Sequence, residues 1–196
     1  MKKLFFLYII TILFSTSGSH AAEPFTILKG EIDQVFSILN DPVYSDESKK
    51  DEQHDKLWKL IENAFDFNAM SRLTLANNWK SFSLEQQDEF SRVFGRFLSN
   101  TYLDKIQSGF SGEQVEYVGE DTLSEKKAVV MTNVIRSGVK TPMNYSMLKT
   151  GSTWKIYDVK IEGVSLLKNY RTQFRSILLK DKPAELIEML KEKINK

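Results

Sequence analysis

The chain has 196 residues, with 27 basic and 26 acidic side chains, a formal net charge of +1, and no cysteine. The balanced charge excludes the basic surface by which nucleic-acid-binding proteins attract phosphates, and the lack of cysteine excludes disulfides, thiol chemistry and cysteine-bound metals. Hydrophobic residues make up 41% of the chain, which is enough for a sizeable core.

Residues 1–21 predict a secretory signal peptide. The chain begins with a methionine and two lysines, continues with an apolar run over residues 4–14, and reaches small residues at a cleavage point near Ala21 or Ala22. The run is too short for a membrane span, which needs roughly 20 apolar residues. We therefore expect export to the periplasm and a single domain over residues 22–196 that folds without disulfides.

Helical spacing predicts two helices at the start of this domain. Apolar residues recur every three or four positions from Pro24 to Leu39, and the breaker sequence Asn40-Asp41-Pro42 follows. A second apolar stripe covers residues 57–65, after a highly charged segment whose Ser, Asp and Glu residues suit a helix start.

Two N-terminal caps mark the helices that follow. Asp66 or Asn68 is positioned to cap a short helix, and Ser83 with Gln86 forms a capping box at the start of a longer one. The longer helix has a broad, aromatic-rich apolar face and ends at Gly109. A face of this width predicts that the helix is covered on more than one side.

After Gly112 the spacing of apolar residues changes from helical to alternating, which predicts strands. Ser137-Gly138 is expected to form the hairpin turn between the second and third of them. The fourth strand leads through Gly163 to a helix that begins near Ser165, and Pro183 starts a final helix. The four expected strands cover residues 115–118, 128–135, 142–149 and 154–161.

Helices, an antiparallel meander and further helices predict the α+β class, as a curved four-stranded sheet wrapped by helices. The fourth strand is apolar on both faces, with Trp154 and Ile156 expected on one face and Tyr157, Val159 and Ile161 on the other. A strand with one face in water alternates apolar and polar residues. This strand is therefore covered on both faces, or it lines an apolar space.

Residues able to support catalysis or metal binding are few. His54 lies in a charged helix and is expected at the surface, and no cluster of His, Asp and Glu has the spacing of a metal site. Asp158 interrupts an apolar strand, either as a catalytic carboxylate or, in the favoured interpretation, as a backbone cap or an ion-pair partner of Arg171 or Arg175. The sequence has no phosphate loop, dinucleotide fingerprint or nucleophile elbow, so we expect neither an enzyme nor a cofactor.

One face of the sheet is expected to carry flexible and aromatic side chains. Methionine adapts to irregular shapes, so such a face either completes an ordinary core or lines a pocket for an apolar ligand. An acyl chain in such a pocket gains about 0.8 kcal/mol for each buried methylene. The expected face consists of Met143, Tyr145 and Met147 beside Val129, Met131, Trp154 and Ile156.

Several strings in the sequence resemble the signature of one known family. Residues 154–159 read W-K-I-Y-D-V, residues 161–166 read I-E-G-V-S-L, and residues 169–174 read N-Y-R-T-Q-F. Together with F-D-F at residues 65–67, they make the chain similar to the MlaC family, the toluene-tolerance auxiliary proteins, over residues 25–190.

This resemblance implies an NTF2-like fold around a hydrophobic cavity. In that family the two acyl chains of a phospholipid insert into the cavity and the headgroup stays near solvent. The helices are then expected to complete the wall that the seven sheet residues begin. The candidate helix residues are Leu73, Phe94, Phe97 and Leu98.

The resemblance also implies a function. Members of the family carry phospholipid through the periplasm between an outer-membrane lipoprotein–porin complex and an inner-membrane ABC transporter with an MCE-domain protein, which maintains outer-membrane lipid asymmetry. We expect such a carrier, as a monomer. The alternatives are a carrier of another lipid such as a hopanoid, an NTF2-like enzyme that uses Asp158, and an interaction module with a filled core.

Overall fold

Residues 23–194 are described by a computed structural model, and the predicted signal peptide lies outside them. Helices and strands follow the expected order. The helices are α1 (Pro24–Leu39), α2 (Lys50–Ala64), α3 (Phe67–Leu75), α4 (Leu84–Gly109), α5 (Leu166–Leu178) and α6 (Pro183–Ile194). The strands are β1 (Gln114–Ser124), β2 (Lys127–Arg136), β3 (Val139–Thr150), β4 (Thr153–Ile161) and β5 (Val164–Ser165).

The predicted caps are present at the helix starts. The Asp66 carboxylate accepts a hydrogen bond from the Ala69 N–H at 2.8 Å and caps α3. Ser83 and Gln86 form the predicted capping box of α4. These bonds pair backbone N–H groups that have no partner within their own helix, so short local signals set where each helix begins.

The strands form one antiparallel sheet in the order β1-β2-β3-β4-β5. The predicted turn between β2 and β3 consists of Ser137 and Gly138, whose φ angles are 49° and 80°. Positive φ at both positions matches the right-handed twist of the flanking strands, and the turn pairs Arg136 with Val139. The two-residue strand β5 pairs with the end of β4, so the sheet has five strands where four were expected.

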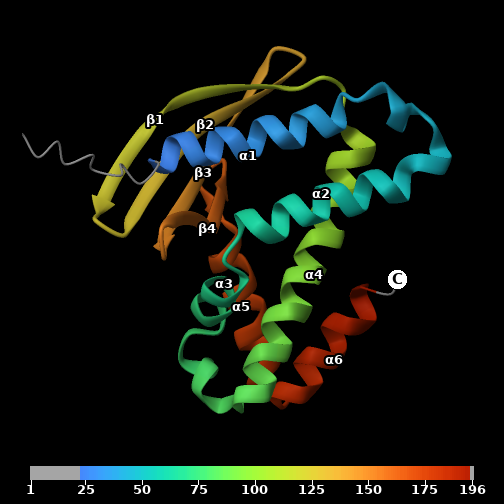
Figure 1. Ribbon diagram of the computed structural model, residues 1–196. Helices are drawn as coiled ribbons and strands as arrows, with labels where there is room; N and C mark the ends of the chain where they lie inside the picture. Colours follow the sequence, from blue (N-terminus) through green and yellow to red (C-terminus); the bar gives the residue numbers. More distant parts are fainter. Residues whose placement is uncertain (1–22, 195–196) are drawn as a thin grey trace, which may run out of the picture.

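Two apolar clusters hold the helices and the sheet together. The first lies among α3, α4, α5 and α6, and includes Phe90, Phe94 and Phe174. The second lies between the sheet and α1, and includes Leu28 and Val130. Figure 1 shows α1 crossing one side of the sheet with α2 next to it, while α3 and α5 lie near β4 and α6 lies farther from the strands. The candidate site lies where α1, α2 and α4 meet the sheet.

Candidate binding cavity

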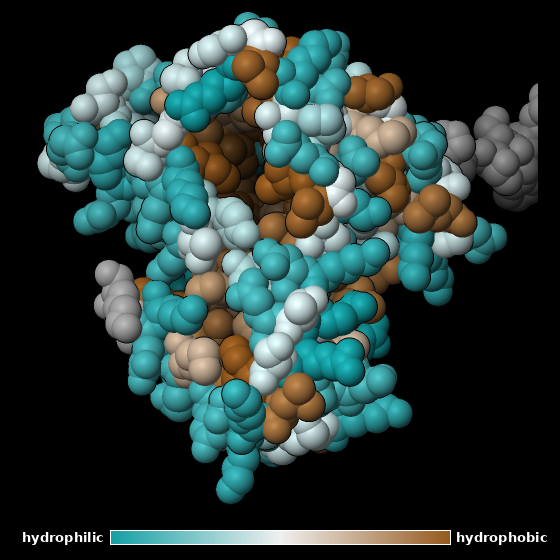
Figure 2. Space-filling model, turned by 180° about the vertical axis from the view of Figure 1, so that it is seen from behind, coloured by the Kyte–Doolittle hydropathy of each residue, from teal (hydrophilic) through white to brown (hydrophobic). Residues whose placement is uncertain are grey.

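An apolar cavity of about 520 Å³ lies between the sheet and helices α1, α2 and α4. Its volume is within the range of about 300–1,000 Å³ that is usual for small-molecule sites. Figure 2 shows a hollow with hydrophobic walls in a mainly hydrophilic surface. Its wall includes Ile32, Val35, Phe36, Leu60, Ile61, Leu98, Tyr102, Leu103 and Ile106 on the helices, and Val134, Met143, Tyr145, Ile156, Val159 and Ile161 on the sheet.

Many apolar side chains of the wall are only half-buried because they face the cavity instead of other side chains. Ile32 and Phe36 on α1 and Met143 on β3 are examples. In the neighbouring helical cluster, by contrast, Phe90 and Phe94 are 0% exposed. Apolar surface is favourable to cover, so this wall is suited to bind an apolar ligand.

The register of β2 and β3 decides which sheet residues face the cavity. Val130 pairs with Tyr145, and these two therefore share the inner face with Met143. Val129 and Met131 alternate with Val130 and lie on the outer face. The prediction that Val129 and Met131 lie beside Met143 and Tyr145 is wrong, because β2 is apolar on both faces and alternation alone does not show which set faces inwards.

A β-bulge in β4 places Ile156 and Val159 on the same face of the strand. Tyr157 is an extra residue opposite the junction of Ser146 and Met147. It reverses the alternation, so Ile156 faces the cavity together with Val159. The prediction that Ile156 and Val159 lie on opposite faces is wrong for this reason.

Four of the eleven predicted cavity residues lie in the wall, namely Leu98, Met143, Tyr145 and Ile156. Met147 and Trp154 are buried in the packed part of the sheet cluster, with 1% and 8% of their surface exposed. Phe94 and Phe97 pack against the tyrosine of α5, with ring centroids 5.5 and 5.7 Å apart, and Leu73 joins the same cluster. The apolar face of α4 therefore belongs to the helical core in its middle and to the cavity nearer its C-terminal end.

Sequence reasoning missed the contributions of α1, α2 and the last turns of α4. The apolar stripe that carries Ile32 and Phe36 is evident in the sequence, as is the stripe that carries Leu60 and Ile61. Periodicity shows which side of a helix turns inwards, but it does not show whether the space opposite is filled. These residues were therefore recognised as apolar without being assigned to a cavity.

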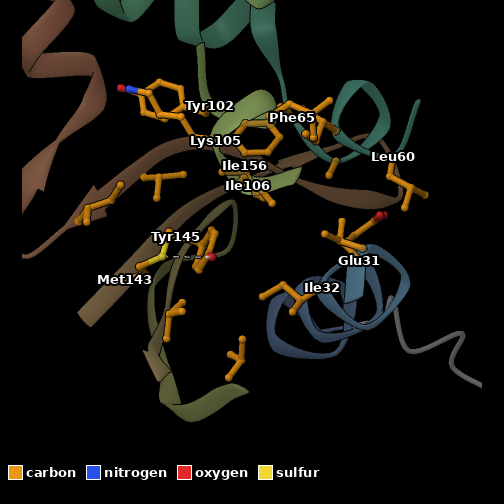
Figure 3. A pocket seen from close by; sticks show the side chains of 18 of the residues that line it. Glu31, Ile32, Leu60, Phe65, Tyr102, Lys105, Ile106, Met143, Tyr145 and Ile156 are labelled. Atoms are coloured by element: carbon orange, nitrogen blue, oxygen red, sulfur yellow. Dashed lines mark hydrogen bonds between the residues drawn. The ribbon is translucent and has the colours of Figure 1, made fainter. Parts of the chain in front are cut away.

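Four of the lining residues are charged. Arg136 and Glu113 form an ion pair with Nε and Oε1 3.2 Å apart, so each charge is balanced by the other. Lys105 and Glu31 lie on opposite sides of the cavity (Figure 3). Burial raises the pKa of the Glu31 carboxyl, and the positive charge of Lys155 opposes this in part.

The hydroxyl of Tyr145 lies at the cavity wall. Figure 3 shows the Tyr145 side chain beside Met143, with its hydroxyl directed at the methionine sulfur. The distance from Tyr145 Oη to Met143 Sδ is 4.0 Å, which is long even for a sulfur acceptor. Burial raises the pKa of Tyr145 to about 12, so the hydroxyl keeps its proton at neutral pH.

Asp158 and His54 are the residues that were considered for catalysis or metal binding. Asp158 is 7% exposed and accepts hydrogen bonds from Ser165 Oγ at 2.6 Å and from the Leu167 N–H at 3.1 Å, so it holds the start of α5. His54 Nε2 lies 3.5 Å from the Asp104 carboxylate. Over residues 23–194, no three His, Cys, Asp or Glu side chains are grouped so that they could hold a metal ion. Within the same range, no helix combines the length and the apolar character needed to cross a membrane.

Comparisons with known proteins agree with this arrangement. A family model described as MlaC protein matches residues 29–192. A protein of Haemophilus influenzae, the intermembrane phospholipid transport system binding protein MlaC, is 22% identical over 204 residues, which cover 98% of this chain and 93% of the relative. A solved structure of a phospholipid-binding protein from Ralstonia solanacearum, in complex with a phospholipid, has a TM-score of 0.76 and 22% identity, and the match covers 89% of this chain and 98% of that one.

Proposed function

The chain belongs to the MlaC protein family, and on this premise we propose that it is a periplasmic carrier that binds phospholipid by its acyl chains. The observation that carries the proposal is the open cavity of about 520 Å³ with apolar walls. Each methylene that enters such a cavity gains about 0.8 kcal/mol, so a chain of ordinary length can offset the cost of leaving a bilayer. The relative from Ralstonia solanacearum, which has the same fold, holds a phospholipid.

The charged residues at the cavity edge support a headgroup position at the opening. Lys105 and Arg136 are exposed lining residues, whereas the inner wall between the sheet and α1 is apolar apart from Glu31. A phosphate stays solvated at such an edge, because burying a charge without a partner is costly, whereas burying an apolar group is favourable. In the proposed complex the chains therefore occupy the interior, and the headgroup lies at the opening.

The proposed chain-binding residues are those that the fold places in the wall. Of the residues expected from the sequence, Leu98, Met143, Tyr145 and Ile156 stay in this assignment. The helices α1 and α2 and the end of α4 add the larger share of the contact surface. Their proposed contributions are Ile32, Val35, Phe36, Leu60, Ile61, Tyr102 and Ile106.

The proposed role is shuttling between membranes. The carrier exchanges phospholipid with an outer-membrane lipoprotein–porin complex and with an inner-membrane ABC transporter that bears an MCE-domain protein, and it thereby maintains outer-membrane lipid asymmetry. Two features support this proposal, namely the family and the signal peptide predicted at residues 1–21. The Haemophilus influenzae relative is named for intermembrane phospholipid transport.

Native mass spectrometry of protein purified without detergent tests the proposal. We expect a species that carries bound lipid, and extraction of the same sample should identify it as glycerophospholipid. Recovery of a hopanoid would replace phospholipid with another lipid class. A lipid-free species that also takes up no phospholipid from vesicles would contradict a carrier function.

A further inference from the structure

The hydroxyl of Tyr145 is a hydrogen-bond donor placed inside an apolar cavity with a poor acceptor. The Tyr145 hydroxyl is directed at Met143 Sδ, 4.0 Å away, and a thioether is a weak acceptor. The hydroxyls of Thr132 and Tyr117 lie nearby, and Thr132 donates its own proton to the Met143 carbonyl oxygen at 3.1 Å. A polar group in such surroundings is costly unless it finds a better partner, and a ligand in the cavity can supply one.

The position of this hydroxyl along β3 indicates which part of a ligand it meets. Thr141, Met143 and Tyr145 lie on one face of β3, and all three line the cavity, with Thr141 nearest to the hairpin that carries Arg136. Strands advance about 3.3 Å per residue, so Met143, the partner of the hydroxyl, is roughly 7 Å farther in than Thr141. The hydroxyl therefore lies below the level of a headgroup phosphate held at the cavity edge.

The polar atoms of a glycerophospholipid just below its phosphate are the ester carbonyl oxygens. They accept hydrogen bonds and cannot donate them, which matches a phenolic donor that stays protonated at neutral pH. Deeper parts of the acyl chains are apolar and match the remaining wall. Apart from Glu31 on α1, the lining thus changes from charged to hydrogen-bonding to apolar in the same order as the lipid.

We propose that the Tyr145 hydroxyl donates a hydrogen bond to an ester carbonyl of the bound lipid and makes the site selective for ester-linked over ether-linked chains. This inference rests on the proposed phospholipid-binding function. A neutral hydrogen bond of ordinary net strength corresponds to about a 5-fold difference in affinity. The bond also sets how deep the glycerol backbone sits, because the chains follow it into the cavity.

A competition between two lipids tests this selectivity. Lipid-free protein is offered equal amounts of a diester phosphatidylcholine and of its dialkyl ether analogue with chains of the same length, and native mass spectrometry gives the ratio bound. We expect wild-type protein to favour the ester by about 5-fold. Tyr145→Phe keeps the ring and removes the hydroxyl, so its ratio should fall to about one. Tyr157→Phe is the matched control, because Tyr157 lies outside the cavity wall, and it should keep the wild-type ratio.

Each outcome separates this inference from the carrier function. Equal ester-to-ether ratios for wild type and Tyr145→Phe, with both lipids bound, would overturn the inference and leave the carrier function in place. An equal loss of selectivity in Tyr145→Phe and Tyr157→Phe would also overturn it, since the effect would not belong to the cavity hydroxyl. Binding of neither lipid by wild-type protein would contradict the proposed function itself.

Discussion

Ile156 and Val159 line the same cavity although they are three residues apart in one strand. Residues at an odd separation in a regular strand point to opposite faces. The bulge at Tyr157 adds one residue between them, so both side chains face α1 and α2, and Ile161 continues the same row. The bulge also bends the strand, as bulges commonly do where a sheet curves around a site. The inner face of β4 thereby presents three branched apolar side chains to the cavity.

Replacing Met143 with tryptophan should exclude lipid without unfolding the protein. Met143 is half-buried and faces the cavity, so the larger ring can enter that space. We expect Met143→Trp to lower the amount of co-purified phospholipid, while the free energy of unfolding falls by less than the roughly 1–3 kcal/mol that overpacking a filled core costs. Lipid is quantified by extraction and stability by urea denaturation.

Met131→Trp is the matched control, because Met131 occupies the neighbouring strand but lies on the outer face of the sheet. It should leave lipid retention unchanged. Equal lipid loss in Met143→Trp and Met131→Trp would show that lipid binding does not depend on the inner face.

Truncating two phenylalanines should distinguish the helical core from the cavity wall. Phe94 is 0% exposed and packs against Phe90, Tyr170 and Phe174, so Phe94→Ala should destabilise the lipid-free protein by about 3–5 kcal/mol. Phe36 is half-buried in the wall, so Phe36→Ala should cost about 1–2 kcal/mol and should reduce lipid retention. Urea denaturation of lipid-free protein measures both values. Similar losses of stability would contradict the assignment of Phe94 to a filled core.

The face of β2 that lines the cavity could have been predicted from the hairpin turn. A two-residue turn at Ser137-Gly138 pairs Arg136 with Val139, and in an antiparallel pair the two residue numbers then keep a constant sum. Tyr145 must therefore oppose Val130 and not Val129 or Met131. The capping signals and the spacing of apolar residues were sufficient to predict the helix starts and the class of fold, because these signals are local in the sequence.

The bulge and the cavity itself depend on contacts between distant parts of the chain. The residues around Tyr157 have no glycine or proline to mark a bulge, and only the pairing with β3 shows that one residue is extra. Similarly, the stripe of α1 that includes Ile32 is the same whether it meets a filled core or an open space. The sequence therefore predicts apolar walls, whereas the separation of α1 from the sheet decides that a cavity lies between them.

The buried position of Glu31 predicts a pH dependence of stability. Its pKa in the folded protein is above the ordinary value of 4.5, chiefly because burial disfavours the charged form. Ionisation is then less favourable in the folded than in the unfolded state, so stability falls as the pH rises from 4.5 through the folded-state pKa. Glu31→Gln, which is neutral at every pH, should be more stable than wild type at pH 7, and the difference should vanish below pH 4.5. Thermal unfolding of lipid-free protein across this range measures it.

Glu116→Gln gives a control of opposite sign. Hydrogen bonds from Lys140 and Asn133 lower the pKa of Glu116, so this residue contributes stability above its unfolded-state pKa, and its replacement should slightly destabilise the protein at pH 7. A Glu31→Gln variant that is less stable than wild type at pH 7 would show that the Lys155 charge outweighs burial at that site.

The close packing of Gly95 against Phe67 predicts that an alanine at position 95 is harmful despite its helical preference. A Cβ at Gly95 would lie 2.9 Å from Phe67 Cγ, so the ring would have to shift from its stacked contacts with Phe65 and Trp58, whose centroids lie 5.8 and 5.9 Å away. Alanine gains about 1 kcal/mol from helix propensity, whereas overpacking costs about 1–3 kcal/mol, so we expect Gly95→Ala to lower the free energy of unfolding by up to about 2 kcal/mol. In a Phe67→Ala background the clashing Cγ and Cδ atoms are absent, and the same substitution should become neutral or stabilising. Urea denaturation of wild type, the two single variants and the double variant gives the free energies of this double-mutant cycle. A stabilising Gly95→Ala in both backgrounds would show that the Phe67 ring shifts freely.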